Sequence, residues 1–361
     1  MNYLMVFVTS LILALVFTPV AIFIAPKIGA VDIPKDGRRM HSKPMPRFGG
    51  LAIFIGTMSS IAIFIIPDNP QLIGLLVGGA LIYILGIVDD VRGMPAKVKF
   101  LGQIAIACVV YALGIRIHFI TAFFSPDYEI TVFPEAVAFI ITILWIVGIT
   151  NTINLIDGLD GLAAGVAFIA SLSIAYSAYI AQGPVGTSIA TMAMLTLAGS
   201  ALGFLPYNFN PAKTFMGDSG SLFLGFMLAV LAIEGATKSA TVVATIAPML
   251  VLGVPIFDTA FAILRRLVNK RPIMEADKGH LHHRIMEAGF GQKRAVLMLY
   301  GISGAMGVAA VLLTRNMLVE SIALLAIAGM LIYIFIADTT SMKLKLKAIN
   351  IEHEEKKERK K

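Results

Sequence analysis

The chain has 361 residues, of which 58% are hydrophobic and only 14% carry a charge. Soluble proteins carry about 25% charged residues, so this composition excludes a soluble protein and predicts a polytopic integral membrane protein. The formal net charge of +7 would suit a nucleic-acid-binding protein, but in a membrane protein it is typical of basic loops on the inner side, and no nucleic acid partner is expected.

Apolar runs follow one another from end to end, and each is close to the helix of about 20 residues that crosses a hydrocarbon core of roughly 30 Å. The first run lacks the basic start and small-residue cleavage site of a signal peptide, so it is expected to remain as a helix. The eighth is short and flanked by glycine. The predicted fold is an all-α transmembrane bundle of about eleven spans: Tyr3–Ala25, Gly50–Ile66, Leu72–Val88, Val98–Ile117, Pro134–Thr150, Leu162–Ala181, Thr187–Leu205, Ser219–Gly235, Thr241–Leu264, Ala295–Leu313 and Leu318–Ala337.

The positive charges predict the orientation of this bundle. If the N-terminus lies outside and the spans alternate, the inner loops and the tail hold 26 of the 29 Lys and Arg residues. Only Arg116, Lys238 and Arg315 then fall outside. Because Lys and Arg collect on the cytoplasmic side, the sequence predicts a multi-pass protein of the inner (cytoplasmic) cell membrane, N-out and C-in. Residues 1–340 would form one transmembrane domain and residues 341–361 a basic cytoplasmic tail.

Three further features bear on the loops and the interior. His118–Phe133 has alternating and aromatic residues, which predicts a small hairpin between two spans. The tail is expected to be attracted to anionic lipid. The single cysteine, Cys108, lies in an apolar run and is interpreted as an inert buried thiol.

Acidic residues in or beside membrane spans are costly and indicate functional sites. With the predicted orientation they gather at the cytoplasmic face, where basic loops and a histidine cluster also lie. This convergence predicts a site for a metal-bound, doubly phosphorylated substrate, with a second substrate arriving from the lipid. The acids are Asp89, Asp90, Asp157, Asp160, Asp218 and, within a span, Asp258.

The adjacent carboxylates of Asp89 and Asp90 follow the third span. Such a pair repels unless a cation or a proton separates its members, so a divalent metal or a general base is the functional interpretation. Lys97 and Lys99 could hold a phosphate nearby. The alternative is a helix end whose charges are simply solvated.

The next motif, Asn151 to Gly161, reads Asn-x-x-Asn-x-x-Asp-Gly-x-Asp-Gly. Its two Asp and two Asn side chains offer hard oxygen ligands of the kind that suits Mg²⁺ or Mn²⁺, whereas a turn-forming loop between two spans would also have this composition. The residues are Asn151, Asn154, Asp157 and Asp160. The eighth span begins at Phe-Met-Gly-Asp-Ser-Gly-Ser, in which Asp218 is either a helix N-cap or a metal ligand.

Two basic loops complete the set. Gly279 to Arg284 reads Gly-His-Leu-His-His-Arg and could bind phosphate. Zinc is less suitable because no cysteine is nearby and a fourth ligand is missing, and solvated histidines are the plain alternative. The loop from Met40 to Gly50 is basic and glycine-ended, and it would suit phosphate or serve only as a positive-inside loop.

Taken together, these motifs resemble the polyprenyl-phosphate N-acetylhexosamine-1-phosphate transferases, a glycosyltransferase family 4 type, in the family's order and over nearly the whole chain. The resemblance implies an enzyme, a phosphotransferase that moves a sugar-1-phosphate from a UDP-amino-sugar to undecaprenyl phosphate and releases UMP. It also implies a requirement for Mg²⁺, with Mn²⁺ as a substitute. The partners would be UDP-N-acetylglucosamine, undecaprenyl phosphate, the membrane and, as an open option, a second copy in a homodimer.

The same resemblance implies roles for individual residues. Asp218 and Asn154 would be the metal ligands. Asp89 would contact or deprotonate the lipid phosphate, with Asp90 in support. The nucleotide site would be shaped by Asp160, Asn208, the catalytic carboxylate Asp157 and, against uracil, Phe215. Phosphates would be bound by Lys43, Lys97, Lys99, His280, His282, His283 and Arg284.

The histidine motif resembles the N-acetylglucosamine branch, which starts teichoic acid linkage units, O-antigen or common antigen, although Leu281 stands where Ile or Phe is more usual. The branch that transfers phospho-N-acetylmuramoyl-pentapeptide typically has three consecutive histidines and ten spans, and it is the alternative. An ion-coupled transporter is more remote, because it would place its acids near the midplane on broken helices. Direct attack by the ionised lipid phosphate is favoured over a covalent intermediate.

Overall fold

The computed structural model describes residues 3–33, 44–65, 70–121, 130–182, 189–237, 248–269, 285–286 and 289–331. These residues are almost entirely helical, and the prediction of an all-α membrane bundle is confirmed. Several predictions fall outside the described residues. They concern Lys43, the histidine loop with His280, His282, His283 and Arg284, and the tail 341–361.

Every predicted span overlaps a helix of the structure. Among the described residues, seven helices are long and apolar enough to cross a membrane: α1 (Tyr3–Ile28), α3 (Pro70–Arg92), α5 (Glu135–Ile156), α6 (Leu162–Gln182), α7 (Ile189–Asn208), α8 (Gly217–Thr237) and α12 (Gln292–Thr314). The others are shorter: α2 (Gly50–Phe64), α4 (Ala96–Ala112), α10 (Gly253–Val268) and the helix Leu318–Leu331. The chain is a multi-pass membrane protein, and the count of eleven spans stays a prediction.

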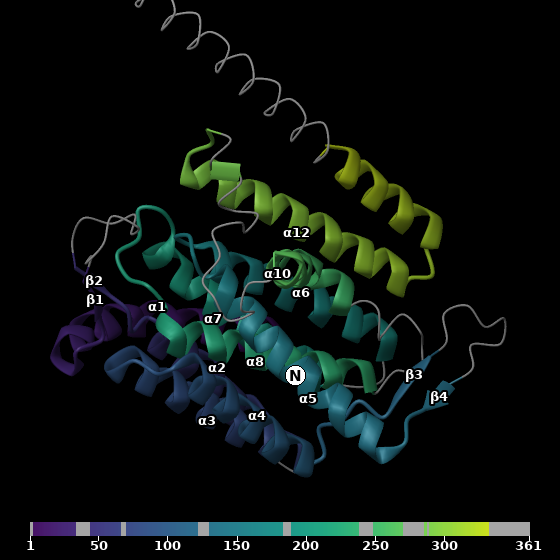
Figure 1. The fold of residues 1–361 in the computed structure, drawn as a ribbon, viewed down its shortest axis with the longest axis horizontal. Coiled ribbons are helices and arrows are strands. Elements are labelled where there is room, and N and C mark those ends of the chain that lie inside the picture. Colours follow the sequence, from purple (N-terminus) through teal and green to yellow (C-terminus); the bar gives the residue numbers. More distant parts are fainter. Residues whose placement is uncertain are drawn as a thin grey trace, which may run out of the picture.

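Helix α8 lies at the centre of the bundle, where it packs against α2, α3, α5, α6 and α7 (Figure 1). From Leu222 to Ile233 each hydrophobic side chain is at most 3% exposed. In the sequence this span stood apart because it is short and flanked by glycine. Its surroundings account for the glycines, since small residues let membrane helices pack closely against one another.

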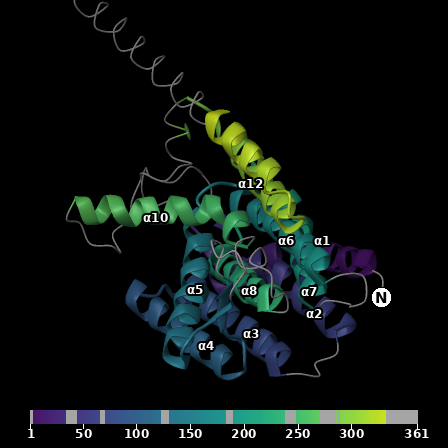
Figure 2. The same ribbon diagram turned by 90° about the vertical axis from the view of Figure 1, so that its right-hand side faces the viewer.

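The outer helices instead turn large apolar side chains outward, as lipid contact requires. Ile84 on α3 and Leu144 on α5 are examples, with 54% and 67% of their surface exposed. Figure 2 shows α10 extending sideways from the bundle, and its Phe257 and Phe261 are also exposed.

Glycines allow the start of α8 to approach two neighbouring helices at backbone distance. A Cβ atom added at Gly86 of α3 would lie 2.3 Å from the Cα of Ser219, and one added at Gly50 of α2 would lie 2.4 Å from the amide nitrogen of Gly220. Small residues at such crossings let helices associate closely in a membrane. The N-terminus of α8 is thereby held tightly between α2 and α3.

We expect Gly86→Ala to destabilise the protein by about 1–3 kcal/mol, because the new methyl group overlaps backbone atoms that cannot move independently. Gly148→Ala is the matched control: that position also lies inside a membrane helix but has no neighbour within 4 Å. The control should be neutral or more stable by about 0.5–1 kcal/mol, owing to the better helix propensity of alanine. Unfolding temperatures in detergent measure both, and equal values would contradict the packing argument.

Two short antiparallel hairpins lie outside the helices. Strand β3 (Phe119–Thr121) pairs with β4 (Ile130–Val132), which confirms the hairpin predicted in this loop. Strand β1 (Val31–Asp32) pairs with β2 (Met45–Pro46), which the sequence did not predict. The carbonyl of Pro46 accepts the backbone N–H of Phe215, so this second hairpin attaches the loop before α2 to the loop before α8.

Candidate functional site

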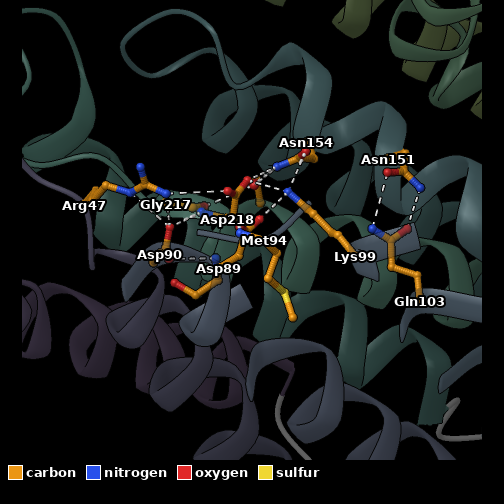
Figure 3. A network of polar contacts seen from close by, with 12 residues as sticks. Arg47, Asp89, Asp90, Met94, Lys99, Gln103, Asn151, Asn154, Gly217 and Asp218 are labelled. Carbon is orange, nitrogen blue, oxygen red and sulfur yellow. Dashed lines mark hydrogen bonds and ion pairs between the residues drawn. The ribbon is translucent and has the colours of Figure 1, made fainter. Parts of the chain in front are cut away.

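Charged and amide side chains from five segments meet at one end of the central helices (Figure 3). Asp89 and Asp90 lie in the last turn of α3, and Asp218 lies in the first turn of α8. Lys99 projects from the first turns of α4, and Asn154 from the last turn of α5. The fifth segment is the loop before α2, which contributes Arg47.

Asp90 holds the N-terminus of α8 from outside that helix. Its Oδ1 accepts the backbone N–H of Asp218 at 2.8 Å, and its Oδ2 accepts that of Ser219 at 2.9 Å. Arg47 donates to Oδ1 through Nε at 3.2 Å and Nη2 at 2.9 Å, and no part of the Asp90 side chain is exposed. A helix N-terminus carries free N–H groups and a partial positive charge, so this carboxylate serves as a cap supplied by α3.

The start of α8 is shaped to receive that carboxylate. Gly217 has a φ of 72°, a conformation that side-chain-bearing residues rarely adopt. A Cβ atom there would lie 2.5 Å from the Oδ2 of Asp90 and 2.5 Å from the carbonyl oxygen of Arg47. The glycine in the Met-Gly-Asp motif is therefore required by the approach of Asp90.

The ammonium group of Lys99 lies between two carboxylates. Its Nζ is 3.0 Å from Oδ2 of Asp89 and 2.9 Å from Oδ1 of Asp218. The Oδ1 of Asn154 accepts from the same nitrogen at 3.4 Å. Asp218 is more open than Asp89 and Asp90, with 25% of its side chain exposed, and it is also within 3.6 Å of Nη2 of Arg47.

Asn154 and Asp89 are both oriented by further hydrogen bonds. The Nδ2 of Asn154 donates to Oδ1 of Asp218 at 2.6 Å and to Oγ of Ser221 at 2.8 Å. The Oδ1 of Asp89 accepts the backbone N–H of Met94 at 2.7 Å. The three side chains around the Lys99 ammonium, those of Asp89, Asn154 and Asp218, are therefore each held by a further hydrogen bond.

The donor set fits a magnesium ion. Hard oxygen atoms from Asp89, Asp218 and Asn154 already converge on a cation, the ammonium of Lys99. Within the described parts of the chain no three His, Cys, Asp or Glu side chains are grouped to hold a metal by themselves. Mg²⁺ is usually bound by one or two carboxylates together with substrate phosphates and water, so few protein ligands are expected.

The loop after α5 is braced against the loop before α8. Asp160 accepts the backbone N–H of Ala212 at 3.1 Å and the Nδ2 of Asn210 at 2.9 Å. Asn208 is only 2% exposed, and its amide joins the N–H of Gly161 to the carbonyl of Thr214. The structure thus gives Asp160 and Asn208 bracing contacts, and their predicted nucleotide contacts remain predictions, as does stacking by the half-buried Phe215.

Asp157 directly follows α5 and carries a perturbed carboxyl group. Burial raises its pKa well above the usual range, and the negative charges of Asp218, Asp90 and Asp160 raise it further. Ionised Asp157 therefore costs free energy in the folded, metal-free protein.

We expect Asp157→Asn to stabilise the metal-free protein at about pH 8 and to leave its stability unchanged at about pH 4. The sign follows from linkage. Where folding raises the pKa of a carboxyl group, the folded protein loses stability as pH rises from the pKa of the unfolded state through that of the folded state. The substitution removes that loss. Unfolding temperatures with a chelator present, measured across this pH range, check it, and a gain that is largest at the acidic end would contradict it.

The structure separates the two predicted lysines and adds residues that the sequence interpretation missed. Lys97 is exposed and, two residues from Lys99, lies on another face of α4. The missed residues are Arg47, Ser221 and Gln103, and Gln103 pairs with Asn151, which the sequence interpretation named in its motif but gave no role (Figure 3). Arg47 had a signal, because it ends the basic loop before Gly50, whereas nothing in the sequence distinguished Gln103.

Comparison with known proteins gives consistent matches. The profile described as "Glycosyl transferase family 4" matches residues 72–236, which run from α3 to α8. A "Probable undecaprenyl-phosphate N-acetylglucosaminyl 1-phosphate transferase" of Bacillus subtilis is 43% identical over 85% of this chain and 84% of its own. A "Decaprenyl-phosphate N-acetylglucosaminephosphotransferase" of Mycobacterium tuberculosis is 34% identical over 77% and 74%. A "Phospho-N-acetylmuramoyl-pentapeptide-transferase" of Staphylococcus haemolyticus is 32% identical over 76% and 88%.

Proposed function

This chain belongs to glycosyl transferase family 4, and from that premise we propose that it transfers N-acetylglucosamine-1-phosphate from UDP-N-acetylglucosamine to undecaprenyl phosphate. An oxygen of the lipid phosphate attacks the phosphorus that carries the sugar. The bond from that phosphorus to the bridging oxygen breaks, UMP leaves with the bridging oxygen, and a lipid-linked diphosphate sugar forms. The product would start a cell-envelope polysaccharide, such as a teichoic acid linkage unit, O-antigen or common antigen.

One observation carries the proposal: acids and bases from five segments meet where α3 and α5 end and α4 and α8 begin. Phosphoryl transfer needs mainly positioning and neutralisation of charge, and this cluster offers both. Arg47 and Lys99 are the cations that would bind diphosphate oxygens. Asp89 is the carboxylate that would orient the lipid phosphate or take its proton, because Asp90 is occupied with capping α8.

Magnesium would be held by Asp218 and the side-chain oxygen of Asn154, and when bound it would neutralise charge on the transferred phosphate. Without the metal, the Lys99 ammonium bridges Asp89 and Asp218. With magnesium held by Asp218, Lys99 would leave that position and become available to a substrate phosphate.

The sugar is proposed from the relatives. N-acetylglucosamine stands in the printed names of the relatives from Bacillus subtilis and Mycobacterium tuberculosis, at 43% and 34% identity. The pentapeptide transferase at 32% identity keeps that donor as the alternative. The site would face the cytoplasm of an inner cell membrane, as the distribution of Lys and Arg predicts.

The test uses purified full-length protein with undecaprenyl phosphate and Mg²⁺. UMP release is compared between UDP-N-acetylglucosamine and UDP-N-acetylmuramoyl-pentapeptide, and the lipid product is identified by mass spectrometry. We expect UMP and lipid-linked N-acetylglucosamine from the first donor only. Turnover of the pentapeptide donor alone would overturn the sugar assignment but keep the reaction, and no turnover of either by folded protein would overturn the function.

A further inference from the structure

Next to the charged cluster, Gln103 of α4 and Asn151 of α5 form a reciprocal amide pair (Figure 3). The Nε2 of Gln103 donates to Oδ1 of Asn151 at 3.3 Å, and the Nδ2 of Asn151 donates to Oε1 of Gln103 at 2.5 Å. The same Nδ2 also donates to the carbonyl of Val147 at 2.8 Å, within α5. Gln103 is only 2% exposed, so the pair is enclosed by protein.

The pair lies directly behind two residues of the site. Gln103 follows Lys99 by four residues on α4, and Asn151 precedes Asn154 by three on α5. Residues three or four apart lie on one face of a helix, so α4 and α5 face each other through two successive contacts. One is Lys99 with Asn154 at 3.4 Å, and the other is the amide pair.

Near the site, the other buried contacts of α4 carry little directional information. Its remaining buried apolar side chains are Ile106, Ala107 and Val110, whereas Phe100 and Leu101 are exposed, and the hydroxyl of buried Tyr111 donates to Glu135 only at the far end of the bundle. Lipid tails are as apolar as these side chains, so no hydrophobic force fixes how such a helix is rotated or shifted along its neighbour. A two-way amide pair has defined donor and acceptor positions and does fix both.

We propose that the Gln103–Asn151 pair is a positioning element, which sets α4 against α5 and so holds the Lys99 ammonium between Asp89 and Asp218 in the metal-free protein. Its contribution to turnover rests on the proposed function, but its effect on Lys99 does not. The pair touches neither the charged cluster's carboxylates nor any position assigned to substrate, so it acts through Lys99.

The test measures how fast Lys99 is acetylated by a small amine-reactive reagent in the full-length protein, with a chelator present and no substrate. An ammonium held between two carboxylates reacts slowly, and the exposed Lys97 on the same helix is the internal reference. Four variants are compared with the unmodified chain: Gln103→Leu, Asn151→Leu, the double leucine variant, and the exchanged pair Gln103→Asn with Asn151→Gln. The ratio of Lys99 to Lys97 acetylation is read by mass spectrometry.

We expect the single and double leucine variants to raise that ratio about threefold to tenfold, the range that corresponds to loss of one interhelical hydrogen-bonded contact in a membrane. The exchanged pair should return the ratio close to that of the unmodified chain. The double variant leaves no unpaired amide, so it keeps the test valid if a single variant does not fold. An unchanged ratio in the folded double variant, or a raised ratio in the folded exchanged pair, would overturn the proposal.

Tyr111→Phe is the matched control. It removes another contact between α4 and α5, the 2.7 Å hydrogen bond from Tyr111 to Glu135 at the far end of the bundle. We expect it to leave the acetylation ratio unchanged, and a rise equal to that of the leucine variants would show general loosening of α4 and overturn the proposal. UMP release, measured in parallel, should show lower kcat in the double variant at an unchanged unfolding temperature. If the unmodified chain releases no UMP, the proposed function fails while the acetylation ratio still decides this inference.

Discussion

Replacing Asp218 with asparagine is expected to slow UMP release by about 10²- to 10³-fold, the usual effect of removing one electrostatic contact from a transition state. Asp218 is the acid at which Lys99, Asn154 and Arg47 converge, and the proposed ligand of magnesium. Asparagine has the same shape, and a quarter of the Asp218 side chain is exposed, so the fold should be retained. Initial rates measured over a range of Mg²⁺ concentrations check this, together with direct Mn²⁺ binding followed by electron paramagnetic resonance.

Glu135→Gln is the control for that experiment. It makes the same carboxylate-to-amide change at the start of α5, at the other end of the bundle, where Glu135 pairs with Arg116 at 2.9 Å. Its rate of UMP release and its Mn²⁺ affinity should be those of the unmodified chain. An Asp218→Asn variant that keeps its full rate and its Mn²⁺ affinity would remove Asp218 from the site.

Asp90→Ala is expected to give the largest loss of stability, about 3–5 kcal/mol, because it breaks a buried charge pair and leaves the partners unsatisfied. The substitution would take the nearest carboxylate from the Arg47 guanidinium, which keeps only Asp218 at 3.6 Å, and would leave two backbone N–H groups at the start of α8 without their acceptor. Since Asp218 is the second residue of that helix, activity should be lost as well. The free energy of unfolding, measured by denaturant titration in detergent micelles, gives the magnitude.

Glu135→Ala provides the comparison for Asp90→Ala. Its ion pair with Arg116 is of similar length, but 66% of the Glu135 side chain is exposed, and such exposed pairs contribute about 0–1 kcal/mol. Losses of equal size in the two variants would contradict the role assigned to Asp90. A large loss of stability for Asp90→Ala alone would support a structural role for Asp90, distinct from the functional role proposed for Asp89.

The sequence was sufficient to predict that Asp89, Asp90, Asp157 and Asp218 gather, because charge asymmetry and acid position are both one-dimensional patterns. Asp89, Asp157 and Asp218 follow or begin apolar runs, and alternating spans bring all three to one face. The hairpin of β3 and β4 was also predictable, since alternation and loop length are local signals. The orientation of the bundle and the metal stay predictions.

The different tasks of Asp89 and Asp90 could not be predicted, because they depend on what each side chain meets in three dimensions. Adjacent residues of a helix point about 100° apart, so Asp90 faces α8 while Asp89 faces Lys99. The central place of α8 was hidden for a related reason. High hydropathy is typical of helices that face lipid, and a helix surrounded by other helices does not need it.

The contact between Asp90 and α8 also has a consequence for biosynthesis. The carboxylate and the backbone amide of Asp218 that it binds are separated by 128 residues. At roughly 5–20 residues per second, the ribosome needs roughly 6–26 s to make the second partner after the first. During that interval the Asp90 carboxylate can pair with Arg47, which is made before it, but the backbone N–H groups of α8 that it caps have not been made. Insertion of α8 is therefore the step that brings Asp218 to the cluster and gives Asp90 the helix N-terminus that it caps.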